Sequence, residues 1–355
     1  MQGELSDSKV IVAASETDVV GYGKNREELS LEEAAFMLDK GKLTIKHGES
    51  ELSFGEFIMR ALDTLPMFTV RYLVYTDLKE RGYAVKTGGV EFWLYPRGTK
   101  PGEKPAKYVI HILAEREFIS LIELDELLSS ARNMRKELIL AVVDEESDIT
   151  YYEVNEPRFD AGIEEECTEG KTKASLVGDR VVLWDAEFAV KLFKNNFYGK
   201  LTKENRLLLS LVETAYLMTK NRVELENTRG THAKLSFVQF IDYAGTIETD
   251  FFDKYLVYSD LKAKGLRVKT GFKFGSHFRA YKVTKQKHSL YLVHVLPRDH
   301  VFFMSGMARA VRLAHGVKKR MIFAFKGNLS TVQDSATMRD ADQSIKYVDI
   351  GRMKL

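Results

Sequence analysis

Cysteine, long apolar runs and net charge are all scarce in this chain of 355 residues. Its only cysteine, Cys167, excludes a disulfide within the chain and any metal site built from cysteines. No apolar run approaches the roughly 20 residues that a membrane helix needs. The opening sequence MQGELSDSKV lacks the basic and then apolar pattern of a signal peptide. We therefore expect a cytoplasmic protein that has no membrane partner.

An internal repeat divides the chain into two halves. Residues 72–88, YLVYTDLKERGYAVKTG, return 183 positions later as YLVYSDLKAKGLRVKTG at 255–271, and 12 of the 17 positions are identical. Such a repeat predicts two copies of one domain, so each copy serves as a control for the other. Residues that the fold requires should occur in both copies. Residues found in one copy only are candidates for function.

The net charge of +2 conceals a strongly basic second copy. Residues 251–325 contain 16 Lys and Arg against 3 Asp and Glu, whereas the matching residues 68–142 contain 12 and 10. Folding does not explain this excess, because charges of one sign repel one another. The excess favours binding of a polyanion, whose phosphates release counterions when they are neutralised. A basic face that is merely solvated is the alternative.

The repeat and the composition predict a mixed α/β fold in two tandem repeats. We expect a small helical or mixed N-terminal subdomain at 1–67 and again at 176–250, and an acidic linker at 157–175. An α/β domain with a restriction-endonuclease-like layout is expected at 68–156 and 251–355. Within the last domain, apolar spacing and turn residues predict helices at 251–264 and 304–314 and strands at 266–270, 277–283, 289–296, 321–325 and 346–350.

Comparison of the two copies separates candidate functional residues from structural ones. Tyr281 and Lys319 have a tyrosine and a lysine as counterparts in the first copy. His294 is also matched by a histidine, so we expect it to be a structural strand residue. His288, however, stands where the first copy has Pro105. A function for His288 is therefore favoured.

A tyrosine, a histidine and a lysine beside a polyanion suit RNA cleavage without a metal. The ribose 2′-OH attacks the neighbouring phosphate if a base removes its proton and an acid protonates the leaving 5′-oxygen. Histidine is the natural acid near neutral pH. A fixed cation stabilises the phosphorane oxygens, and nearby cations help a tyrosine to act as the base. We expect the three side chains to converge and to face solvent.

Several motifs resemble the archaeal tRNA-splicing endonucleases, in the class whose subunit is a fused tandem repeat. They are FKFGSHFRAY, HSLYLV and RLAHGVKKRMIFA in the basic copy, with FYGK and LSLVETAYLM before them. The resemblance implies that Tyr281 is the general base, His288 the general acid and Lys319 the cation on the transition state. It also implies that Arg312 and Arg352 grip a bulged base between their guanidinium planes.

The resemblance implies a tRNA-intron lyase that excises introns from precursor tRNA at bulge–helix–bulge elements. It implies 2′,3′-cyclic phosphate and 5′-hydroxyl ends, no metal or other cofactor, and an inactive first copy. Two cuts per intron and one active centre per chain suit a two-fold homodimer. We expect the acidic loop of the first copy to dock on the partner's basic copy, with a solvated loop as the alternative. Its carboxylates are Asp144, Glu145, Glu146 and Asp148.

Two other functions stay open. A non-catalytic RNA-binding or structural subunit should lack a member of the triad in both copies, whereas the basic copy has all three. A metal-dependent nuclease of the restriction type needs clustered carboxylates. The basic copy offers only Asp253, Asp260 and Asp299, which are widely spaced. The role of the long segment 326–344 is not predicted.

Overall fold

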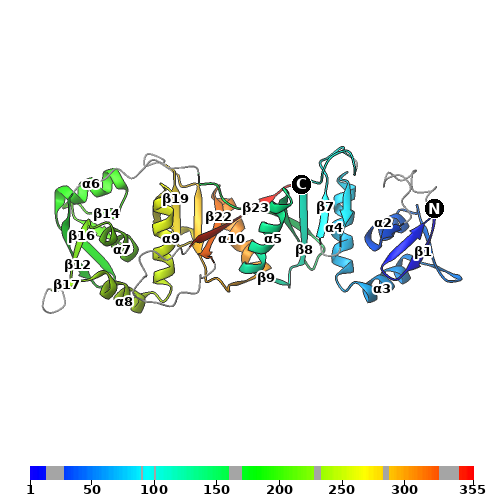
Figure 1. The fold of residues 1–355 in the computed structure, drawn as a ribbon, viewed down its shortest axis with the longest axis horizontal. Coiled ribbons are helices and arrows are strands. Elements are labelled where there is room, and N and C mark those ends of the chain that lie inside the picture. Colours follow the sequence, from blue (N-terminus) through cyan, green and yellow to red (C-terminus); the bar gives the residue numbers. More distant parts are fainter. Residues whose placement is uncertain are drawn as a thin grey trace. The chain divides into compact units, whose positions relative to one another are not determined.

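The computed structural model describes residues 1–12, 28–88, 91–99, 101–159, 170–227, 233–282, 288–327 and 344–355. The chain divides into two compact units (Figure 1). The first unit contains Met1–Asn155, Val301–Ala308 and Gly351–Leu355, and the second contains Glu156–His300 and Arg309–Ile350. Both units are mixed α/β, and each repeat consists of an N-terminal subdomain and an α/β domain. The two tandem repeats predicted from the sequence are confirmed.

In its described residues, the N-terminal subdomain of the first unit is a five-stranded sheet in the order β3-β2-β1-β4-β5 with two helices. Both helices begin at a capping box, formed by Ser30 with Glu33 and by Ser53 with Glu56. The elements are β1 (Gln2–Ser6), β2 (Lys9–Val12), β3 (Glu28–Ser30), α2 (Leu31–Asp39), β4 (Thr44–His47), β5 (Ser50–Leu52) and α3 (Phe54–Thr64).

The second unit repeats this plan with a six-stranded sheet in the order β14-β15-β13-β12-β16-β17. Capping boxes recur at Ser210 with Glu213 and at Ser236 with Gln239. The sequence did not predict these strands, because runs as short as two residues carry too little alternation. The elements are β12 (Thr172–Val177), β13 (Arg180–Leu183), α6 (Ala186–Asn196), β14 (Lys200–Leu201), β15 (Leu207–Leu209), α7 (Leu211–Thr219), β16 (Val223–Asn227), β17 (Lys234–Leu235) and α8 (Phe237–Ile247).

The α/β domain of the first unit has five strands in the order β11-β10-β8-β7-β6. Only the β8–β10 pair is parallel. β9 lies outside this sheet and pairs with β21 (Val301–Phe303). The elements are α4 (Phe68–Glu80), β6 (Val85–Thr87), β7 (Glu91–Leu94), β8 (Tyr108–Ala114), β9 (Phe118–Ser120), α5 (Leu121–Asn133), β10 (Glu137–Val143) and β11 (Ile149–Asn155).

The α/β domain of the second copy has the same strand plan, β18-β19-β20-β22-β23, with β20 and β22 parallel. Both predicted helices and all five predicted strands are present, and β21 and the 3-10 turn η1 are additions. The elements are α9 (Phe251–Ala263), β18 (Arg267–Thr270), η1 (Phe272–Phe274), β19 (Phe278–Tyr281), β20 (Tyr291–Val295), α10 (Met304–Gly316), β22 (Arg320–Lys326) and β23 (Ile345–Met353).

A matched hydrogen bond holds the α/β domain of each copy. The Tyr151 hydroxyl donates to Asp77 at 2.7 Å, and the Tyr347 hydroxyl donates to Asp260 at 2.5 Å. Burial raises the pKa of both tyrosines, so their hydroxyls stay protonated and act as donors. Asp260 also pairs with Lys264. The aspartate shared by the two copies thus has a structural partner in each.

The register of the second sheet decides which side chains lie beside the candidate site. Val268, Ala280 and Val293 pack in the core, together with Val257 and Leu261 of α9. Because side chains alternate along a strand, their neighbours lie on the other face. That face receives Arg267 and Lys269 from β18, opposite Tyr281 and Arg279 of β19.

Candidate active site

Three chain segments of the second unit meet at one edge of the sheet. Tyr281 is the last residue of β19, while β20 and β22 begin just after Leu290 and Lys319. The Leu290 N–H donates to the Ala280 carbonyl at 3.0 Å, and the Arg320 N–H donates to the Leu290 carbonyl at 3.2 Å. These bonds place the end of β19 and the starts of β20 and β22 side by side.

Lys319 is tied to the segment that carries His288. Its Nζ donates to the Ser289 carbonyl at 3.0 Å and lies 5.6 Å from the centre of the Phe274 ring. Partial burial lowers the pKa of Lys319, and the neighbouring Arg279 guanidinium lowers it further. Among the described residues no carboxylate forms an ion pair with Lys319. The amine is therefore a positioned cation that is open to an anion.

Tyr281 and His288 differ in exposure. His288 is exposed, as expected for a residue that meets a ligand. Tyr281 is only 6% exposed, and its ring lies edge-on to Phe197, 5.4 Å between ring centres. The tyrosine is thus more covered than the solvent-facing position that we expected. Residues 283–287, which connect the two, lie outside the described residues.

His294 lies in a packed environment. Its ring lies 4.4 Å from that of His277, whose Nδ1 accepts the Val295 N–H at 2.9 Å. Burial lowers the pKa of both histidines, that of His277 to about 4, so both are neutral at pH 7. The matching His111 of the first copy is buried, and burial lowers its pKa as well. These surroundings suit a structural role for His294.

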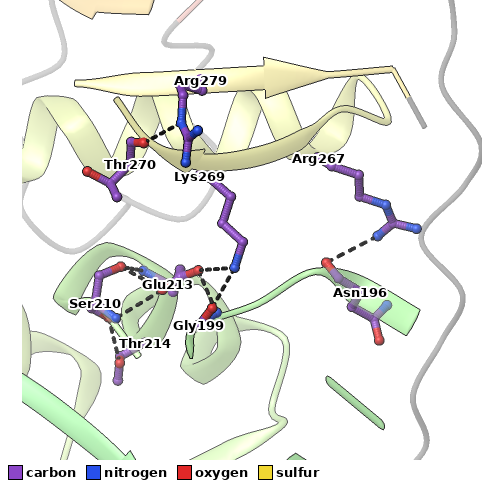
Figure 2. Close-up of polar contacts among 9 residues, drawn as sticks. All are labelled: Asn196, Gly199, Ser210, Glu213, Thr214, Arg267, Lys269, Thr270 and Arg279. Carbon is purple, nitrogen blue, oxygen red and sulfur yellow. Dashed lines mark hydrogen bonds and ion pairs between the residues drawn. The ribbon is translucent and has the colours of Figure 1, made fainter. Parts of the chain in front are cut away.

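Polar contacts attach the N-terminal subdomain of the second repeat to the cationic face of the sheet (Figure 2). The Lys269 Nζ donates to the Gly199 carbonyl at 2.7 Å and lies 3.8 Å from a Glu213 oxygen. Burial lowers the pKa of Lys269, and Glu213 opposes that shift. The Arg279 Nε donates to the Thr270 carbonyl at 2.8 Å. Lys269 therefore has a carboxylate partner within the protein, whereas Arg279 contacts a carbonyl.

The first copy shows which parts of this site belong to the fold. Its Lys136 Nζ donates to the Ala106 carbonyl at 3.0 Å, which matches the Lys319 bond. Lys136 also lies 5.0 Å from the Trp93 ring, and Trp93 stands where the second copy has Arg279. The tethered lysine is thus common to both copies. The arginine is specific to the second copy, and the sequence analysis missed it although the aligned motifs contained the signal.

A pocket of about 570 Å³ lies where the two subdomains of the second repeat meet. Its lining includes the cations Arg180, Lys200, Lys254 and Lys269, and the carboxylates Glu213 and Glu248. Glu213 lies near Lys269, and Glu248 pairs with Lys254. Arg180 pairs with Asp179 at 2.7 Å, whereas Lys200 has no ion pair among the described residues. Lys200 is therefore the lining cation that is open to an acidic occupant.

Of the remaining predicted site residues, Asp144 is half-buried and the others are exposed. Arg312 lies on α10 and Arg352 on β23, in different units. The loop between β10 and β11 is a tight turn in which Asp144 Oδ1 accepts the N–H groups of Glu146 at 3.0 Å and Asp148 at 2.8 Å. Glu145 pairs with an arginine of the same unit. The described residues contain no group of three or more potential metal ligands.

None of the helices in the described residues is long and apolar enough to cross a bilayer.

The chain is similar to known proteins along nearly its whole length. The family model described as the tRNA intron endonuclease catalytic C-terminal domain matches residues 68–151 and 251–333. The model of the tRNA intron endonuclease N-terminal domain matches residues 1–58 and 172–241. The tRNA-splicing endonuclease of Methanosarcina barkeri is 40% identical over 99% of this chain and 97% of its own. That of Natronomonas pharaonis is 34% identical over 99% of both chains.

Proposed function

The chain belongs to the tRNA-splicing endonucleases, and on this basis we propose that its second repeat cuts precursor tRNA by metal-independent attack of a ribose 2′-OH. The observation that carries the mechanism is the bond from Lys319 to the Ser289 carbonyl. It holds a cation without a carboxylate partner among the described residues beside the exposed His288. Lys319 and His288 lie at the same edge of the sheet as Tyr281, the last residue of β19.

The reaction is a transesterification that Tyr281 and His288 divide between them. Tyr281 removes the proton of the 2′-OH, and the 2′-oxygen forms a bond to the adjacent phosphorus. The bond from phosphorus to the 5′-oxygen breaks, and His288 gives that oxygen its proton. Lys319 stabilises the negative charge that collects on the phosphorane oxygens. The products are a 2′,3′-cyclic phosphate and a 5′-hydroxyl. Because no water is consumed in this step, the enzyme is classified as a lyase.

We also propose that the enzyme recognises a bulge–helix–bulge element through Arg312 and Arg352. Both side chains are exposed, and guanidinium planes can stack on an unpaired base. The change Arg312→Ala should then weaken cleavage of bulged RNA. Equal rates for this variant and the wild type, measured at a substrate concentration below KM, would remove Arg312 from the site.

The active form is proposed to be a homodimer in which the acidic loop enters the partner's basic pocket. The loop, residues 144–148, is fixed by its own hydrogen bonds and exposes Glu145, Glu146 and Asp148, whereas Asp144 is half-buried. Arg180 and Lys200 line the pocket of the second repeat. Arg180 pairs with Asp179, whereas Lys200 has no ion pair among the described residues. The acidic turn and this lysine are complementary in charge.

The proposed mechanism can be tested on an intron-containing precursor tRNA in excess EDTA. We expect cleavage at both intron ends, with the cyclic phosphate identified by mass spectrometry. His288→Ala and Tyr281→Phe should each slow cleavage by about 100-fold or more while RNA binding persists. Tyr95→Phe, the matching change in the first copy, should cleave at the wild-type rate.

Each alternative function has its own outcome in this experiment. Cleavage that stops in EDTA and returns with Mg²⁺ would show a metal-dependent nuclease. A wild-type chain that binds the RNA without cutting it would be a non-catalytic subunit. Full activity of His288→Ala would refute its role as the general acid.

A further inference from the structure

We infer that Arg279 is a further substrate-contacting residue, which binds the scissile phosphate beside Lys319. This inference rests on the proposed RNA cleavage and adds a second cation to that site. It depends on three observations: the position of Arg279 relative to Tyr281 and Lys319, the hydrogen-bonding groups that Arg279 leaves available, and the residue that replaces it in the first copy.

The position of Arg279 places its charge at the candidate site. Arg279 lies two residues before Tyr281 on β19, so both side chains are on the same face of the sheet. Its guanidinium carbon lies 5.9 Å from the Tyr281 ring centre and 5.5 Å from that of Phe274. The Lys319 Nζ lies 5.6 Å from the same Phe274 ring. Two cations thus lie against one aromatic ring, next to the proposed base.

Within the described part of the chain, the side-chain hydrogen bond of Arg279 uses Nε and leaves the two outer nitrogens available. The Nε donates to the Thr270 carbonyl, which orients the guanidinium plane. No carboxylate forms an ion pair with Arg279 among the described residues, whereas the adjacent Lys269 has Glu213. A guanidinium held in this way can present two parallel N–H groups to a phosphate. The positive charges of Arg279 and Lys319 repel each other, and a bound phosphate would relieve that repulsion.

The turn before β19 fixes the aromatic ring that both cations contact. The Ser276 Oγ donates to the Phe278 carbonyl at 3.2 Å, and the Gly271 N–H donates to the His277 carbonyl at 2.9 Å. Gly275 adopts a φ of +63°, a backbone conformation that is unfavourable for residues with a side chain. The turn therefore holds Phe274 in a defined place.

The matching segment of the first copy is shorter and contains no arginine. Its sequence, KTGGVEFWLY, is three residues shorter than KTGFKFGSHFRAY of the second copy. Trp93 takes the place of Arg279, and Lys136 contacts that tryptophan. Yet the lysine tether and the sheet are the same in both copies. The fold therefore does not require Arg279 or its turn, which leaves substrate contact as the reason for their presence.

Cleavage kinetics test this role. Arg279→Met keeps the length of the side chain and removes its charge, and we expect kcat/KM on bulged RNA to fall by about 100-fold or more. Arg279→Lys should recover only part of this loss, because a point charge does not replace two parallel donors. Arg206→Met removes an exposed arginine of the same unit that contacts Trp184, and it should cleave normally. Thermal unfolding should show that all three variants are folded.

Two further measurements distinguish phosphate contact from a structural role. On RNA with a 2′-deoxy group at the cleavage site, Arg279→Met should reduce the slope of log Kd against log salt by about one. Added guanidinium ion should raise the activity of Arg279→Ala and leave that of His288→Ala unchanged. An unchanged salt slope together with no rescue would overturn the inference.

The inference and the proposed function can fail separately. If the wild-type chain does not cleave bulged RNA, the proposed function is wrong, whatever Arg279 does. If the wild type cleaves and Arg279→Met cleaves at the same rate, only the inference is wrong.

Discussion

A buried ion pair in the first copy allows a quantitative test of what holds that unit together. The Glu32 carboxylate lies 2.6 Å from the Arg71 Nε, and both side chains are about 95% buried, with exposed fractions of 4% and 6%. Arg71 also donates to the Gly88 carbonyl at 2.8 Å and lies over the Phe92 ring. The second copy has Val212 and Lys254 at the matching positions, and Lys254 pairs instead with Glu248 and Asp250.

The change Glu32→Val introduces the residue of the second copy but leaves the Arg71 charge buried. Removing one partner of a buried pair costs about 3–5 kcal/mol. With a urea dependence of roughly 2 kcal/mol per molar, the unfolding midpoint of the first unit should fall by about 1.5–2.5 M. Glu32→Val combined with Arg71→Met should recover most of this loss, because apolar replacement of a buried pair is often neutral.

Fluorescence can follow each unit separately, since the chain has two tryptophans, Trp93 in the first unit and Trp184 in the second. We expect the Trp93 transition to move and the Trp184 transition to stay. Glu28→Gln, which breaks the exposed Lys9–Glu28 pair, should shift the midpoint by less than about 0.5 M. An equally small shift for Glu32→Val would refute the reasoning.

Two other predictions concern the second unit and the dimer. A histidine in the unfolded chain binds its proton below about pH 6.5, but folded His277 does so only near pH 4, so acid favours unfolding between these values. The wild type should therefore lose stability between pH 7 and pH 4.5, and His277→Phe should reduce this loss by an amount on the order of 2 kcal/mol after allowance for solvent. Urea unfolding followed by Trp184 fluorescence measures the loss at each pH. An identical loss in the variant would exclude His277 as its source. Reversal of the four loop charges should dissociate the proposed homodimer; the variant combines Asp144→Lys, Glu145→Lys, Glu146→Lys and Asp148→Lys. If light scattering still shows a dimer, the loop is not part of the interface.

Local signals in the sequence were sufficient for the helices and longer strands of the α/β domain. The helix predicted at 251–264 is α9, and the strand predicted at 321–325 is β22. Both have continuous apolar patterns and a glycine or a charged residue at their ends. The strands of the N-terminal subdomains were missed, because pairing with distant segments stabilises them rather than their own sequence. The 3-10 turn at 272–274 was missed for another reason: its three residues are too few to form a periodic pattern, and local hydrogen bonds of Gly271 with Ser276 and His277 hold it.

The candidate site was predicted residue by residue but not in its geometry. His288 was chosen because the first copy has a proline at its position. Tyr281 and Lys319 were chosen because the motifs that contain them resemble those of a known family. The coverage of Tyr281 by Phe197 joins residues more than eighty positions apart in the chain, and nothing in the motif indicates it. Arg279 was visible in the alignment of the copies. Its importance emerged only when the structure showed which cations have partners.

Residue order alone was enough to show that this chain is a doubled module, that its second copy carries the positive charge, and which family it resembles. These properties depend on residue identity and linear spacing, which can be counted along the chain. For the basic residues of that copy that the structure describes, only the folded chain shows which have a carboxylate partner and which do not. Charge pairing depends on distances between elements that are far apart in the chain: Lys269 of β18 lies near Glu213 of α7, and Arg279 contacts no carboxylate among the described residues. Counting charges along the chain does not distinguish the two.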